Sequence, residues 1–103
     1  MSRPPMPAAG DRPFRERVFA VVAQIGPGEL MTYGDVADEA GRPRAARAVG
    51  SILAAAGGGA LPWWRVVTVT GRLVPGAEAE HAQRLEAEGH TCRAGRVTTR
   101  MSR

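Results

Sequence analysis

Three polar side chains near the middle of the chain have the chemistry and the spacing to bind a polyanion. Arg44, Arg47 and Ser51 follow one another at intervals of three and four residues, which places them on one face of a helix. Guanidinium groups donate several hydrogen bonds in a rigid planar fork that suits phosphate oxygens. The opposite face of this segment is apolar and carries Val49, Ile52, Leu53 and Ala56. The pattern predicts an amphipathic helix with a basic outer face.

The basic residues are separated from the acidic residues along the chain. Residues 41–77 contain five arginines and no carboxylate, whereas residues 29–39 contain four carboxylates and no base. A net charge of +4, segregated in this way, suits a polyanionic partner. Arginines that only keep a protein soluble explain the same distribution equally well, so charge alone leaves both interpretations open.

Thiol and metal chemistry have little support in the sequence. Cys92 is the one cysteine, which excludes an internal disulfide, and the 2 histidines offer no metal-ligand spacing. The neighbouring arginines could lower the pKa of the thiol, but a tolerated surface cysteine is the simpler interpretation. We therefore expect no metal and no cofactor.

The length of 103 residues predicts one small domain. No apolar run approaches the roughly 20 residues that cross a membrane. Residues 1–10 lack the charged-then-apolar pattern of a secretion signal. We expect a flexible lead at 1–12, a folded domain at 13–90 and a mobile basic tail at 91–103. We also expect a monomer in the cytoplasm, associated with the nucleoid.

The elements that would position the arginines follow from short-range signals. Thr32 followed by Asp35 resembles a capping box and predicts a helix that begins at Tyr33 and stops at Gly41. Pro43 suits the first position of the next helix, which is the basic one. Two helices joined by a three-residue turn indicate a helix-turn-helix. Many helical hairpins with this pattern bind nothing, so the motif alone does not establish a function.

Further elements are predicted on both sides of this pair. Apolar residues recur at helical spacing over 14–25, which predicts a first helix. The aromatic and β-branched run at 64–69, the Thr-Gly turn at 70–71 and the strand residues 72–74 predict a β-hairpin, or wing. A last helix is expected to end near Gly89. The fold class is therefore mainly α with a small β-hairpin, a winged helix-turn-helix DNA-binding domain.

Four segments, taken in order, resemble one known family. They are Thr32-Tyr33-Gly34, the run from Gly41 to Gly50, Pro62-Trp63-Trp64-Arg65-Val66, and Glu88-Gly89. Together they resemble the C-terminal domain of the O6-alkylguanine-DNA alkyltransferases over residues 14–89. This resemblance implies binding to double-stranded DNA that contains O6-alkylguanine.

The chain departs from this family where the family's chemistry takes place. The enzymes carry Pro-Cys-His-Arg-Val, in which the cysteine accepts the alkyl group and the histidine activates it; here these two positions are Trp63 and Trp64. Glu88 matches a glutamate that orients the histidine, and an asparagine of the enzymes is missing from 54–58. An indole cannot replace a thiolate as the nucleophile. The chain therefore resembles the non-catalytic alkyltransferase-like proteins, although these often keep the histidine.

The resemblance implies roles for the residues of the helix pair. Arg47 would enter the duplex and fill the space left by the flipped-out guanine, and Tyr33 would crowd the lesion's 3′ phosphate and help to rotate the nucleotide. The alternatives are a surface arginine and a tyrosine that only packs. Small side chains such as Ala45 would let the helix lie close to the minor groove. The expected DNA-binding residues are Thr32, Tyr33, Arg44, Ala45, Arg47 and Ser51.

A lesion pocket is expected around the two tryptophans. Because neighbours in a strand point to opposite sides, we expect Trp63 to face the pocket and Trp64 to pack in the core. A purely structural role for both is the alternative. Tyr33, Arg65 and Val74 are the other expected pocket residues, with Arg65 favoured as a structural or phosphate-side contact.

The sequence thus predicts a non-enzymatic sensor that binds O6-alkylguanine in DNA and flags it for the proteins of nucleotide excision repair. A winged-helix, sequence-specific transcription regulator is the alternative, weakened by the lack of an obvious dimerisation helix. A residual alkyltransferase lacks its cysteine, and a glycosylase would need a carboxylate or lysine beside the flipped base.

Overall fold

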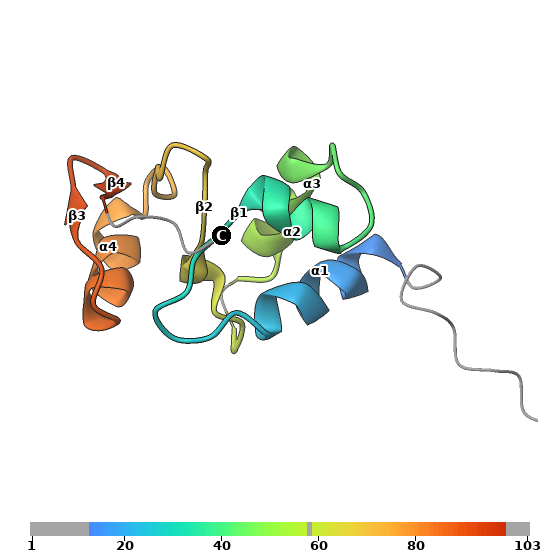
Figure 1. The fold of residues 1–103 in the computed structure, drawn as a ribbon, viewed down its shortest axis with the longest axis horizontal. Helices are drawn as coiled ribbons and strands as arrows, with labels where there is room; N and C mark the ends of the chain where they lie inside the picture. Colours follow the sequence, from blue (N-terminus) through green and yellow to red (C-terminus); the bar gives the residue numbers. More distant parts are fainter. Residues whose placement is uncertain (1–12, 58, 99–103) are drawn as a thin grey trace, which may run out of the picture.

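The computed structural model describes residues 13–57 and 59–98, and it is mainly helical with two very short sheets (Figure 1). Within these residues the helices are α1 (Phe14–Ala23), α2 (Tyr33–Glu39), α3 (Ala46–Ala55) and α4 (Glu78–Ala87). The strands are β1 (Met31–Thr32), β2 (Val66–Val67), β3 (Cys92–Arg93) and β4 (Arg96–Val97), and a short 3-10 helix spans Trp63–Arg65. The predicted fold class, mainly helical with a small hairpin, is confirmed. The expected lead at 1–12 and the end of the expected tail at 99–103 lie outside the described residues.

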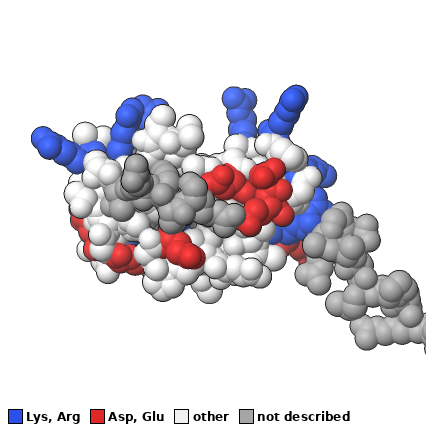
Figure 2. Space-filling model, in the orientation of Figure 1, with Lys and Arg blue, Asp and Glu red and all other residues white. Residues whose placement is uncertain are grey.

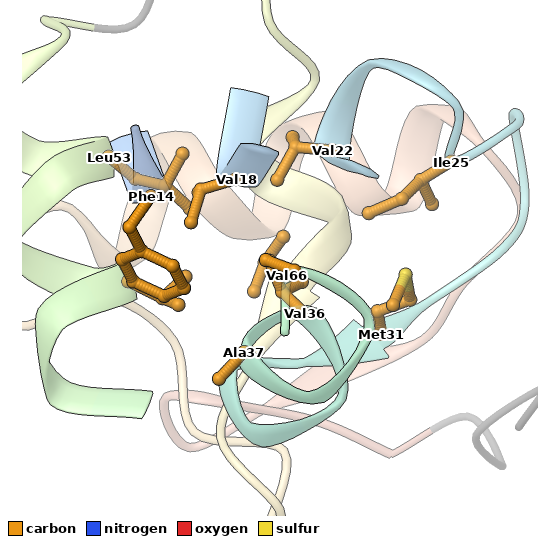
Figure 3. Close-up of a cluster of buried hydrophobic side chains, with 11 residues drawn as sticks. Phe14, Val18, Val22, Ile25, Met31, Val36, Ala37, Leu53 and Val66 are labelled. Atoms are coloured by element: carbon orange, nitrogen blue, oxygen red, sulfur yellow. The ribbon is translucent and has the colours of Figure 1, made fainter. Parts of the chain in front are cut away.

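Helices α1, α2 and α3 pack around the first of two hydrophobic core clusters. The α1 residues Phe14, Val18 and Val22 turn inward together, as their spacing predicts. Figure 3 shows them facing Val36 of α2 and Val66 of β2. Each such side chain contributes about 1.5–3 kcal/mol when it is fully buried. This cluster fixes the helix pair α2–α3 on α1.

The second cluster lies between β2, α4 and the C-terminal hairpin, and it contains Leu30, Val67, Leu73, Leu85 and Val97. Strand β2 separates the two clusters because adjacent strand residues point to opposite faces: Val66 enters the first cluster and Val67 the second. It pairs in parallel with β1, with Met31 opposite Val66. The two cores are therefore held together at one very short strand pair.

The start of α2 is as predicted, but the turn after it is longer. The Thr32 hydroxyl accepts the Asp35 N–H at 2.9 Å and the Asp35 carboxylate accepts the Thr32 N–H at 3.1 Å, which completes the capping box. The predicted helical start at Pro43 is wrong, because α3 begins at Ala46. Pro43 instead occupies a turn closed by the Ala45 N–H and the Arg42 carbonyl at 3.0 Å, a position that suits the fixed φ of proline.

The predicted wing has different partners from those expected. The turn at Gly71 forms, with its N–H bonded to the Thr68 carbonyl at 2.8 Å, but β2 before it pairs with β1. The chain after the turn pairs with β4, through an Arg72–Arg96 bridge. The expected mobile tail is also corrected, because 92–97 form the hairpin β3–β4. Burial of Val97 in the second core explains why this segment is ordered.

Candidate nucleic-acid interface

A groove of about 990 Å³ runs along α2 and α3 and is closed by the loop after β2. It contains four of the expected DNA-binding residues, Thr32, Tyr33, Arg47 and Ser51. Arg47 lies in the first turn of α3 and is exposed. The other two, Arg44 and Ala45, line a shallow pocket on the turn before α3. The structure thus brings the expected DNA-binding residues to one helix pair.

A second cavity, of about 520 Å³, adjoins this groove. The residues that line both spaces are Tyr33, Gly50, Ala54 and Thr68. Trp63 and Val74, two of the expected pocket residues, line the cavity but not the groove. The two spaces therefore share a boundary at which Tyr33 lies.

Tyr33 is the aromatic side chain at the boundary of the two spaces. It is the first residue of α2, so the capping box fixes the start of its helix. Burial raises the pKa of its phenol, which keeps the hydroxyl neutral. Gly50 of α3 faces it, and a Cβ at this position would lie 3.9 Å from the Tyr33 ring. The small Gly50 thus leaves room for the Tyr33 ring between α2 and α3.

The two tryptophans have different surroundings. Trp63 lines the cavity, whereas Trp64 packs against the second core. Their rings meet edge to face, with centroids 6.1 Å apart and planes at 88°. The prediction that the two side chains alternate across a strand is wrong, because both residues lie on the 3-10 helix. The guanidinium groups of Arg65 and Arg84 lie 5.1 and 4.8 Å from the Trp64 ring centroid, which holds this indole in place.

His81 of α4 does not line the cavity but supports Trp63 from behind, a role that the sequence did not indicate. Its side chain is fully buried and its ring lies 5.0 Å from that of Trp63. Nδ1 accepts the Val74 N–H at 3.1 Å, so Nε2 carries the proton and donates to the Trp64 carbonyl at 2.8 Å. Burial lowers the pKa of His81 and outweighs the opposing effect of the Trp64 carbonyl. The sequence signal for its burial was its position four residues before the apolar Leu85, on the same helix face.

Arg65, expected in the lesion pocket, is not among the residues that line the cavity. Its Nε donates to the Glu88 carboxylate at 3.0 Å and its Nη1 donates to the Ile25 carbonyl at 2.7 Å. The hydrogen bond from Arg65 holds the pKa of Glu88 below its usual range, against the effect of burial. Glu88, which has no histidine to orient, is thus an ion-pair partner that ties the end of α4 to the loop after α1.

The Cys92 thiol is not part of the cavity wall. It packs against the second core and does not line the cavity. Burial and the nearby Glu86 carboxylate raise the pKa of its thiol, the reverse of the lowering by arginines that the sequence allowed.

Across residues 13–57 and 59–98, no three histidine, cysteine or acidic side chains are grouped to hold a metal, and no helix is long and apolar enough to span a membrane.

The groove is lined by the carboxylates of Asp35 and Asp38 as well as by Arg47, and further basic side chains project from one edge of the molecule. Figure 2 shows them projecting from the upper edge at both ends, above α2–α3 and above the C-terminal hairpin, while acidic side chains occupy the face below. A helix-turn-helix with Arg47 on its second helix and Arg44 on the turn before it, bordered by a cavity, is an arrangement that DNA-binding domains use.

The family follows from the sequence match. Residues 13–90 match the family described as 6-O-methylguanine DNA methyltransferase, DNA binding domain, and the chain belongs to this family. The resemblance drawn from the four motifs is confirmed.

Two relatives named DNA base-flipping protein are similar to the chain. The one from Escherichia coli (strain K12) is 47% identical over 79 residues, which cover 74% of this chain and 61% of that protein. The one from Vibrio parahaemolyticus is 42% identical over 79 residues, covering 74% of this chain and 79% of that protein. The chain therefore spans about three fifths of the length of the E. coli relative.

Solved structures show the same fold. S. pombe Atl1 in complex with damaged DNA containing O6-carboxymethylguanine has a TM-score of 0.70 and 31% identity, over 76% of this chain and 77% of Atl1. The O6-methylguanine methyltransferase of Mycobacterium tuberculosis has a TM-score of 0.61 and 34% identity, over 73% of this chain and 47% of the enzyme.

Proposed function

We propose that this protein binds O6-alkylguanine in duplex DNA, receives the extruded nucleotide in the cavity and does not remove the alkyl group. The observation that carries this proposal is the placement of the Trp63 indole in a cavity that adjoins the groove of Arg47. The cavity volume of about 520 Å³ lies within the usual range for small-molecule sites. The names of the base-flipping relatives and the DNA complex of Atl1 support the same function.

The groove residues supply the binding steps. Arg47 enters the duplex from α3 and bonds to the cytosine left without its partner, while Tyr33 crowds the phosphate of the rotating nucleotide. Thr32, Arg44 and Ser51 contact the backbone around them. Extrusion costs a few kcal/mol and less for a poorly paired, alkylated guanine, which supplies part of the selectivity. Trp63 then stacks on the base or contacts its alkyl group.

The side chain at the position of the enzymes' cysteine is the Trp63 indole, and the Glu80 carboxylate that also lines the cavity is paired with the Arg84 guanidinium at 3.3 Å. An indole offers a neutral N–H and a π face rather than a nucleophile. The ring nitrogens of His81 are both engaged in hydrogen bonds, and the raised pKa of Cys92 keeps its thiol protonated. A bound lesion therefore persists. We infer that the complex passes the site to a separate pathway that excises the nucleotide, for which nucleotide excision repair proteins are the candidates.

A binding comparison tests the function. The affinity for a duplex with one O6-methylguanine should exceed that for the same duplex with guanine, and mass spectrometry afterwards should show no methyl gain on any residue. Arg47→Ala should lower the affinity for the damaged duplex more than Arg15→Ala, a change on α1, which contributes no residue to the groove. Equal affinity for both duplexes contradicts the proposal, and selection of a sharp undamaged motif from random duplexes would instead indicate a transcription regulator.

The handover to excision repair has its own test. Immobilised protein should capture excision repair proteins from a bacterial lysate when it is loaded with O6-methylguanine duplex, and less of them when it is loaded with undamaged duplex. Equal capture in both cases contradicts a lesion-dependent handover.

A further inference from the structure

Three arginines form a row across neighbouring strands at the C-terminal end of the molecule. Arg93 of β3 is directly opposite Arg96 of β4, and Arg96 forms a bridge with Arg72 on its other side. Residues that are opposite in an antiparallel sheet point to the same face. We call these three residues the arginine row. Strand spacings of 4.7–4.9 Å give it a length of about 10 Å at the backbone.

The row lies on the outer face of this small sheet. The alternate residues Leu73, Cys92 and Val97 pack into the second core, so the arginines between them point away from it. Arg72, Arg93 and Arg96 are all exposed. The face is therefore open to a partner.

The arrangement costs stability in the isolated protein. Like charges that are directly opposite on a sheet repel each other. The repulsion is largest between Arg72 and Arg96, because the Leu73–Gly95 and Val97–Gly71 hydrogen bonds of 2.9 Å enclose a non-hydrogen-bonded pair, in which side chains are closest. Within residues 13–57 and 59–98, no carboxylate lies within 4.0 Å of these guanidinium groups. Glu78 lies beside Gly95, Glu80 lines the cavity with Arg72, and Glu86 lies near Cys92, but none of them forms an ion pair with the row, so the guanidinium groups keep their hydrogen-bond donors for an anionic ligand.

The arginine row lies close to the cavity that adjoins the groove. Arg72 lines the cavity together with Tyr33 and Trp63, so the row begins at the cavity rim and continues through Arg96 to Arg93. In Figure 2 the basic side chains above the hairpin project from the same edge as those above α2–α3. Two members lie beyond residue 90, where the family match ends.

We propose that the arginine row binds the backbone phosphates of duplex DNA beside the extruded nucleotide, as a second contact separate from α3. This inference rests on the proposed function for the presence of DNA. Duplex DNA presents one negative charge per about 1.7 Å of its axis, so a row of this length faces several phosphates. Phosphate contacts position a protein without reading its bases, so the row adds affinity and not lesion preference.

The experiment measures affinity against salt concentration for damaged and undamaged duplexes of equal length. The double variant Arg93→Gln/Arg96→Gln should lower the slope of log K against log salt by about 0.9 per lost contact, hence by about 1.8. The ratio of the two affinities should stay unchanged. Arg15→Gln on α1 is the matched control and should leave the slope as it is. Arg93→Lys/Arg96→Lys keeps the charge and should keep the slope.

The thermal midpoint of the glutamine variant should equal or exceed that of the parent, because a repulsion has been removed. A slope no lower than that of Arg15→Gln overturns the inference, as does a lysine variant that loses the slope as the glutamine variant does. The experiment distinguishes a failure of the arginine-row inference from a failure of the proposed lesion binding. An unchanged slope with retained lesion preference removes only the row, whereas a lowered slope without lesion preference removes only the lesion sensor.

Discussion

At the scale of single residues, the Trp63 indole has the clearest effect to measure. It lines the cavity and is only partly buried, with the Arg84 guanidinium 5.9 Å from its ring centroid. Trp63→Ala should weaken binding to O6-methylguanine duplex by about 1–3 kcal/mol, the range for one base stacked on an aromatic side chain. Binding to the undamaged duplex should change much less, as measured by fluorescence anisotropy. An equal loss on both duplexes would assign Trp63 a purely structural role.

His81 should make the stability of the protein depend on pH. Burial lowers its pKa from the ordinary value of 6.5, so the unfolded chain binds a proton more readily than the folded one. The stabilisation is complete above that value and declines as the pH falls below it toward the depressed pKa. Urea unfolding from about pH 7.5 to 5.5 should therefore show a falling free energy of unfolding.

A matched variant isolates this effect. His81→Gln can accept the Val74 N–H through its oxygen and donate to the Trp64 carbonyl through its nitrogen, but it does not titrate. It should remove the pH dependence in this window. The lowered pKa of Glu88 acts at lower pH, below its ordinary value of 4.5, and does not interfere. A persistent slope in the glutamine variant would exclude His81 as its source.

The sequence could predict the residues whose role depends on local spacing. Arg47 and Tyr33 were located through motifs and meet at the groove. Arg65 and His81 could not be placed in this way, because their partners are distant in the chain: the Ile25 carbonyl is 40 residues from Arg65, and the Trp64 carbonyl is 17 residues from His81. Contacts of this kind depend on how distant segments pack against one another, which no short motif specifies.

At the scale of elements, the turn at Gly71 controls how the strand after it meets β4. Gly71 has a φ of 82°, and a Cβ there would lie 2.7 Å from the Val97 carbonyl oxygen. Gly76 has a similar φ of 86° but open space around it. Gly71→Ala should therefore lower the thermal midpoint more than Gly76→Ala, since both variants share the backbone strain and only one adds a clash. Equal losses would contradict the close approach.

The turns at Gly71 and Pro43 show which features of the elements the sequence could not predict. A Thr-Gly turn was predicted correctly at Gly71, but a turn does not reveal which strand its second arm will pair with. Both β2 residues are fully buried, one in each core, and this central place requires pairing with β1. Pro43 fits a helix start and a turn equally well. The choice between them follows from the α2–α3 packing rather than from the proline.

At the scale of the whole molecule, the Arg65–Glu88 ion pair joins parts built on different cores. Its side chains are only 12% and 14% exposed. Arg65→Met should lower the free energy of unfolding by about 3 kcal/mol, because it leaves a mostly buried carboxylate without its partner. The double variant Arg65→Met/Glu88→Leu should regain part of this loss in urea titrations. A double variant less stable than Arg65→Met alone would contradict this account.

The overall fold was predictable to the extent that it depends on helix periodicity. The apolar spacing of α1 and the capping box of α2 define the first core. The second core was not predictable, because its members Leu30, Val67 and Val97 come from separate short segments without a period. The hairpin at 92–97 was not predicted either, because its short strands show no period in the sequence.

The edge-to-face tryptophan pair has an optical consequence. These are the only 2 tryptophans in the chain, so the intrinsic emission of the protein originates at the cavity wall and in the core beside it. An extruded purine stacked on Trp63 would quench the emission of that indole and, because the Trp64 ring is 6.1 Å away, would also draw energy from Trp64. The protein therefore carries its own fluorophore for base extrusion, which stopped-flow mixing with unlabelled duplexes could follow in real time.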